Sequence, residues 1–139
     1  PMSDLSINQN EQAREAEMAV LGGLMLETHR FDSVIQIIKE NDFHDPNHQI
    51  IFQAMSELVE ENKPLDPLTV SEKLDSNNKL QTVGGKDNLI ELATSTPSAA
   101  NLEAYAEIIK QRSITRNLMK TNSEIAELIR NPQGQNQRP

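Results

Sequence analysis

Apolar residues recur at intervals of three and four through almost the whole of this 139-residue chain, whereas no stretch shows the alternation typical of a strand. The clearest run lies in residues 47–61, where Ile51, Met55 and Leu58 share one face of a predicted helix. Further helical patterns lie in residues 11–25, 31–40, 67–74, 86–94 and 99–130. The sequence therefore predicts an all-α fold.

Two of these helices have clear start signals. Asp45 precedes Pro46, and Asp66 precedes Pro67, so each aspartate can cap a helix whose first residue is proline. We expect the core-facing residues near them to include Phe31, Val34, Ile35 and Ile38 in one helix, and Leu68, Val70 and Leu74 in another.

The glycine pair Gly22-Gly23 falls inside the first helical pattern, where each glycine costs about 1 kcal/mol relative to alanine. A phosphate-binding loop is the functional alternative, but no third glycine and no preceding strand complete one. The pair therefore indicates a close contact between helices.

The patterns divide the chain into four segments. Residues 1–10 are polar and aperiodic, which predicts a flexible arm, and residues 11–110 form the globular helical domain. The apolar stripe of the last helix rotates near residues 111–113, so residues 111–131 are predicted to face a different partner. Residues 132–139 are polar and predicted to be a disordered tail.

This last helix carries a second apolar stripe for which the sequence offers no obvious mate. A helix with an uncovered apolar stripe usually docks on a partner, although the stripe could instead fold back onto the domain. The candidate partner-binding residues on it are Ile114, Leu118, Met119, Ile125, Leu128 and Ile129.

The pair His44 and His48 raises the possibility of a metal site, because histidines four apart on one helix can bind zinc. Pro46 stands between them, however, so only His48 lies inside the helix, with a local backbone group or Asp45 as its expected partner. No HExxH motif and no P-loop are present, and the chain has no cysteine. The sequence predicts no catalytic, cofactor-binding or metal-ligating residue.

Charge argues against a nucleic-acid or membrane-surface protein, because the net charge is −8. Basic residues on the long helix, at positions 110, 112, 116 and 120, are more simply read as a solvated stripe with local ion pairs. No signal sequence and no apolar run of about 18 residues is visible, so a cytoplasmic protein is expected.

Four stretches together resemble a known family. They are EAEMAVLGGLML (15–26), DFHDPNHQIIFQAM (42–55), LDPLT (65–69) and VGGKDNLIELATSTPSAANLEAYAEIIKQR (83–112), of which TPSAAN followed by YAEII is the most specific. Their order and spacing are similar to those of the N-terminal domain of bacterial, phage-borne or plasmid-borne DnaB-type replicative DNA helicases.

The resemblance implies a compact bundle of about six helices, with residues 111–131 as the first helix of a truncated linker hairpin. It also implies a collar or scaffold domain that joins subunits and docks a DnaG-type primase at the replication fork. It implies a homohexamer for the full-length helicase, with a dimer expected for this chain. ATP, Mg²⁺ and DNA translocation belong, in that family, to a C-terminal RecA-like domain that this sequence lacks, so no catalysis and no cofactor are expected here. The rival interpretations are a free-standing DNA-binding regulatory protein and a small enzyme.

Three positions depart from the family pattern: Met18 replaces a glutamine, His44 an aromatic residue, and Asn88 another aromatic residue. Asn88 is expected to be exposed, at the place of a usual primase contact. Glu15 and Asn88 join the candidate partner-binding residues as the place where a partner would dock if the long helix does not bind it.

Overall fold

The computed structural model describes residues 2–96 and 98–133, which contain helices and no strand. The two 3-10 helices are η1 (Thr28–Arg30) and η2 (Glu40–Asp42). The α-helices are α1 (Met2–Leu26), α2 (Phe31–Ile35), α3 (Pro46–Glu60), α4 (Pro67–Ser76), α5 (Gly85–Ser95) and α6 (Leu102–Arg130). The predicted all-α bundle of about six helices is thus confirmed.

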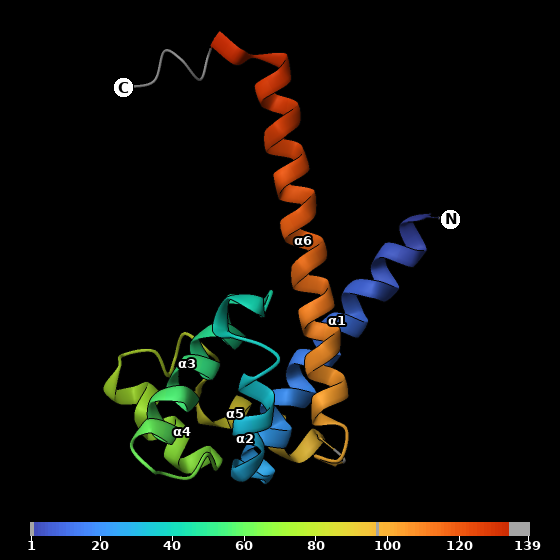
Figure 1. Cartoon of the computed structure of the whole chain (residues 1–139). Helices are drawn as coiled ribbons and strands as arrows, with labels where there is room; N and C mark the ends of the chain where they lie inside the picture. The colour runs from blue at the N-terminus through green and yellow to red at the C-terminus, as the bar shows by residue number, and fades with distance from the viewer. Residues whose placement is uncertain (1, 97, 134–139) are drawn as a thin grey trace.

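The helices divide into a packed head and a projecting arm. Helix α1 packs against α3, α5 and α6, and α4 packs against α3 and α5. The outer part of α6, residues 114–130, extends away from the other helices as a single rod, and the start of α1 diverges from it in another direction (Figure 1). We call residues 114–130 the arm and residues 11–113 the head. The hairpin that α6 was predicted to begin stays a prediction.

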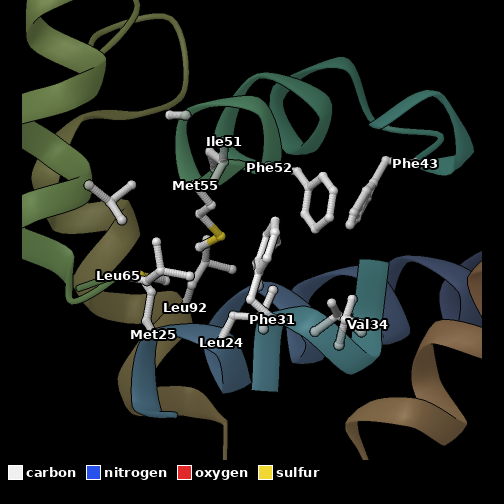
Figure 2. Close-up of a cluster of buried hydrophobic side chains, with 14 of the residues drawn as sticks. Leu24, Met25, Phe31, Val34, Phe43, Ile51, Phe52, Met55, Leu65 and Leu92 are labelled. Carbon is white, nitrogen blue, oxygen red and sulfur yellow. The ribbon is translucent and has the colours of Figure 1, made fainter. Parts of the chain in front are cut away.

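The core lies where α1, α3 and α5 meet (Figure 2). Ile51, Met55 and Leu58 are buried there, as their spacing predicted. Phe52 stacks on Phe31 with ring centroids 5.4 Å apart and tilts against Phe43 at 5.0 Å. Aliphatic side chains fill the rest of this core.

Helix starts and ends follow the local signals. The carboxylate of Asp45 accepts from the backbone N–H of Asn47, and that of Asp66 accepts from Thr69, so both predicted N-caps are confirmed. At the other end of α3, Asn62 has a φ of +60°, and the N–H of Lys63 returns to the carbonyl of Leu58. This is a Schellman motif, which asparagine supports better than most residues.

Other element boundaries differ from the sequence prediction. Helix α1 begins at Met2 rather than Glu11, and neither glycine nor proline interrupts residues 2–10. Helix α2 ends at Ile35 rather than Glu40, because Lys39 is extended and donates its backbone N–H to the Asp42 carboxylate. This local side-chain bond competes with the helical one and starts η2 instead.

Two residues predicted to face the core are exposed. Ile35 is 43% exposed because the short α2 buries Phe31 and Val34 on its other side. Leu68 is 53% exposed because residues two apart on a helix point in nearly opposite directions, and Val70 takes the inward one.

The contact predicted at Gly22-Gly23 is confirmed. A Cβ on Gly22 would lie 2.0 Å from Thr96 Oγ1 and 2.2 Å from the carbonyl oxygen of Leu92. A Cβ on Gly23 would lie 2.4 Å from Leu102 Cδ2. Helix α1 can therefore approach α5 and the start of α6 this closely only because it lacks side chains there.

We expect Gly22→Ala to destabilise the head by about 1–3 kcal/mol, because the new methyl group overpacks the contact. Its gain in helix propensity, about 1 kcal/mol, opposes that loss. Urea unfolding followed by circular dichroism measures the change, and Arg14→Ala, at an exposed site of the same helix, is the control. A variant as stable as the parent would show that α1 and α5 are not in close contact.

Candidate functional site

The arm exposes the apolar stripe that the sequence predicted. Met119 is 67% exposed and Ile129 76% exposed, and the other members lie between 40% and 59%. The alternative that this stripe folds back onto the head is therefore wrong. The exposed members are all six predicted residues: Ile114, Leu118, Met119, Ile125, Leu128 and Ile129.

The inner half of α6 uses a different side of the helix. Leu102, Ala106, Ile109 and Ser113 are buried against the head at spacings of four, three and four. Ile114 begins the outer stripe one residue after Ser113, which turns it by about 100° around the helix axis. The two halves of one continuous helix therefore present their faces in different directions, and the head does not use the outer one.

Asp42 holds α6 where it leaves the head. Ser113 Oγ donates to Asp42 Oδ1 at 2.6 Å, and Arg116 Nη2 donates to the backbone carbonyl of Asp42 at 2.9 Å. The Lys110 ammonium lies 3.5 Å from Asp42 Oδ2. Of the basic residues at positions 110, 112, 116 and 120, Lys110 and Arg116 thus pair with a residue 68 and 74 positions away in sequence, and not with a near neighbour on the helix as expected.

Burial raises the pKa of the Asp42 carboxyl, but hydrogen bonds from Ser113 and the Lys39 backbone, with the charge of Lys110, outweigh it. The pKa is therefore lower than its ordinary value of 3.8. A carboxyl with a lowered pKa stabilises the folded state fully above its unfolded pKa. That stabilisation is lost as the pH falls through the folded pKa.

We expect the free energy of unfolding to fall as the pH drops below about 4, and to fall less steeply in Asp42→Asn. Urea unfolding at a series of pH values measures both slopes, with Asp75→Asn, at an exposed carboxylate, as the control. Equal slopes in the parent and Asp42→Asn would contradict a lowered pKa at Asp42.

A buried carboxylate ties α1 to the start of α3. Glu17 is 2% exposed and accepts from the backbone N–H of His44 at 2.7 Å and of Asp45 at 3.3 Å. His48 Nδ1 lies 2.7 Å from Glu17 Oε1, whereas its Nε2 is 3.8 Å from Asp45. The expected partner of His48 was therefore wrong: Glu17, 31 residues away in sequence, holds the ring.

Glu15 lies on the other side of α1 and lines a groove of about 420 Å³ between α1, the end of α5 and α6. Apolar side chains form much of its lining, among them Met18 and Ile108, with Tyr105 beside them. Ile108 belongs to α6 and is 38% exposed. The structure thus places Glu15 at the edge of a partly apolar groove that borders the base of the arm.

Asn88 does not lie in this groove, and its predicted exposure is wrong. It is half-buried near the start of α5, where its Nδ2 donates to the carbonyl of Val83 at 2.8 Å. Its side chain also packs beside Gly84, whose φ is +97°. Asn88 therefore steadies the loop that precedes α5, and the structure does not bring it together with Glu15 or the arm.

No group of three or more His, Cys, Asp or Glu side chains among the described residues is arranged to hold a metal ion. None of the helices from Met2 to Arg130 combines the length and apolar character that crossing a membrane requires.

An exposed apolar face on a projecting helix commonly marks a protein–protein contact. Residues 9–111 match the family described as "DnaB-like helicase N terminal domain". The chain therefore belongs to the DnaB-like helicase N-terminal domain family, as the four sequence stretches predicted.

Individual relatives agree with this assignment. The chain is 39% identical over 120 residues to the replicative DNA helicase DnaB of Buchnera aphidicola and 38% identical over 121 residues to that of Haemophilus influenzae. These matches cover 86% and 87% of this chain and 26% of each relative. The chain thus spans about a quarter of the length of the curated relatives it matches.

Solved structures show the same fold. The N-terminal domain of DnaB helicase from Mycobacterium tuberculosis superposes with a TM-score of 0.79 at 31% identity, over 81% of this chain and 78% of that one. The N-terminal domain from Helicobacter pylori, described with its interactions with primase, gives 0.78 at 27% identity, over 89% and 97%. The head and part of α6 are therefore shared with known members of the family.

Proposed function

We propose that this chain is the N-terminal scaffold domain of a replicative DNA helicase, which joins subunits and docks primase at the replication fork. In this role the chain itself is not catalytic and needs neither ATP nor a metal ion. The relatives that it matches are named replicative DNA helicases, which supports the proposal. Because those relatives are bacterial replication proteins, the proposed location is the cytoplasm.

The observation that carries this proposal is the exposed apolar face of the arm. A fully buried leucine, isoleucine or methionine contributes about 1.5–3 kcal/mol relative to an exposed one. Six such side chains are exposed along residues 114–129. A partner that covers this face would gain enough free energy to offset the cost of association.

The width of the face favours contact with more than one helix. Leu118 and Met119 are adjacent, so they point about 100° apart around the axis. Ile129 lies between these two directions when the helix is followed outward. We propose a second copy of this chain as the first partner, giving a dimer, and a hexamer for a full-length helicase that carries it.

Primase is the second proposed partner, because the Helicobacter pylori relative is described together with it. The arm is the main proposed contact, and the groove that Glu15 lines is the alternative one. Asn88 is a weaker candidate than the sequence suggested, since its amide is already bonded to Val83.

A DNA-binding regulatory protein remains the rival function. It would need the basic residues of α6 to be available for phosphate, yet Lys110 and Arg116 contact Asp42. The net charge of −8 also opposes it. DNA is therefore not proposed as a ligand of this chain.

Sedimentation and calorimetry test the proposal. We expect the chain to self-associate at micromolar concentration and to bind the helicase-binding domain of a DnaG-type primase. A monomer at high micromolar concentration that binds no primase would contradict it. Binding to duplex DNA that weakens steeply with salt would support the regulatory alternative instead.

A further inference from the structure

Helix α6 passes from packed to free at one short stretch. Ser113 is its last fully buried residue, and Arg116 is half-buried one turn later. From residue 117 to residue 133 every described residue is exposed except Ala126, which is half-buried. The contacts of residues 110–116 with the head therefore set the direction of the outer part of α6.

The groups that hold this stretch converge on Asp42. Lys110, Ser113 and Arg116 follow one another at intervals of three residues and so lie along one side of the helix. Two of them meet the Asp42 carboxylate and the third meets its backbone carbonyl. Asp42 thus contacts side chains along nearly two turns of α6.

Asp42 is itself fixed to the core. Its Oδ2 accepts from the Lys39 backbone N–H at 2.8 Å, and its own N–H donates to the Lys39 carbonyl at 3.0 Å. The next residue, Phe43, is fully buried and packs against Phe52 on α3. Asp42 therefore links α6 to the most tightly packed part of the head.

We propose that Asp42 is a positioning residue that, with Ser113 and Arg116, forms a joint setting the direction in which the arm leaves the head. The stripe on the arm does not include any of these three residues. The joint therefore acts on assembly only through the direction of the arm, and this consequence for assembly rests on the proposed function.

A small change at the joint has a large effect at the end of the arm. Residues 116 and 129 are separated by about 20 Å of helix at 1.5 Å per residue. A tilt of about 15° at the joint moves the outer end of the arm by roughly 5 Å. Two helices that pack side-chain ridges of one into grooves of the other lose this packing after such a displacement. Partners that contact both head and arm therefore need the joint intact.

Loss of the joint should lower the stability of the head without unfolding it. Leu102, Ala106 and Ile109 are buried in the core, and none of them is among the residues that contact Asp42. The Arg30 guanidinium also donates to Glu103, which holds the start of α6 against η1 independently. Removing the Asp42 contacts should therefore loosen the arm and leave the head folded.

Pulsed electron double resonance between two spin labels tests the joint directly. The chain has no cysteine, so labels attach only at introduced ones. The head–arm pair is Gln53→Cys with Ser123→Cys, and the pair within the head is Gln53→Cys with Lys86→Cys, all at exposed positions. Dilution into excess unlabelled protein restricts the measured distances to those within one chain.

We expect a narrow head–arm distance distribution in the parent and a broader or shifted one in Asp42→Ala and in Ser113→Ala. The distance within the head should stay the same, and Asp75→Ala should change neither. If Asp42→Ala does not fold, the head–arm distance distribution of Ser113→Ala tests the joint instead. Unchanged head–arm distributions would overturn the proposal, as would broadening of both pairs together, which indicates a general loss of structure.

Self-association gives a second readout. Residues that couple distant sites typically change affinity by about 2- to 30-fold, and we expect a weakening in this range for both alanine variants. If charges placed on the stripe itself leave self-association unchanged, the arm is not the surface through which the chains associate, and the proposed function loses the observation that carries it. The distance measurement still decides whether Asp42 sets the direction of the arm.

Discussion

Phe52→Ala is expected to lower the free energy of unfolding of the head by about 3–5 kcal/mol. Phe52 is 1% exposed and contacts Phe31 and Phe43, so all three phenylalanines of the chain meet around it. Truncation removes the aromatic pairs on both sides and leaves a cavity between α2, α3 and the segment after η2. Rigid neighbours cannot close such a cavity completely, which adds to the lost transfer free energy.

Urea unfolding followed by circular dichroism measures this loss. The neighbouring residue Gln53 is exposed, so Gln53→Ala should change stability by no more than about 0.5 kcal/mol. A loss below about 1 kcal/mol in Phe52→Ala would mean that the three rings do not form the centre of the core.

Sequence alone predicts the parts of this fold that depend on near neighbours. The caps at Asp45 and Asp66 need only a backbone N–H two or three residues away, and both form. The glycine pair inside an apolar pattern predicts that Gly22-Gly23 makes a close helix contact. It does not predict that the partners are Leu92, Thr96 and Leu102. Periodicity likewise predicts which side of α3 is buried.

The errors fall where a distant residue decides. His48 is expected from the sequence to pair with a local backbone group or Asp45, but its partner is the buried Glu17, 31 residues away. The sequence assigns no role to Asp42, whose partners on α6 lie 68 to 74 residues away. A hydrogen bond between residues so far apart leaves no periodic signal in either segment.

The candidate site shows the same division. The six apolar residues of the arm follow from periodicity and are exposed as a group. The joint that sets the direction of the arm has only one sign in the sequence, the polar residues 111–113, where the apolar stripe rotates. Ser113 explains this polar stretch, because a small hydroxyl residue is needed where the helix meets the Asp42 carboxylate.

The helix of the arm is only marginally stable by itself, and a partner would stabilise it. An isolated helix of this length is marginal in water, and residues 117–130 have little contact with the head. Their helical form depends on continuing from the anchored inner half of α6. Covering the apolar face with another helix would stabilise both the helical form of the arm and the assembly. The proposed association of subunits would therefore also keep the arm helical.

Leu118→Asp combined with Ile125→Asp is expected to abolish self-association and to weaken primase binding. The two residues lie seven apart, on the same line along the arm, and they are 59% and 49% exposed. Replacing them removes two buried side chains from the proposed interface, about 1.5–3 kcal/mol each, and places two charges in it. The dissociation constant should rise at least about a hundredfold. The head should stay folded by circular dichroism, because neither residue contributes to its core.

Asn117→Asp combined with Ser123→Asp is the matched control, since it adds the same two charges to the arm outside the apolar stripe. Sedimentation equilibrium should show the parent association for this control and only monomer for the stripe variant. If the stripe variant unfolds the head, the stripe belongs to the core after all. If it alters neither association nor primase binding, the docking surface lies elsewhere, and the groove lined by Glu15, Met18 and Ile108 becomes the place to introduce the next charge.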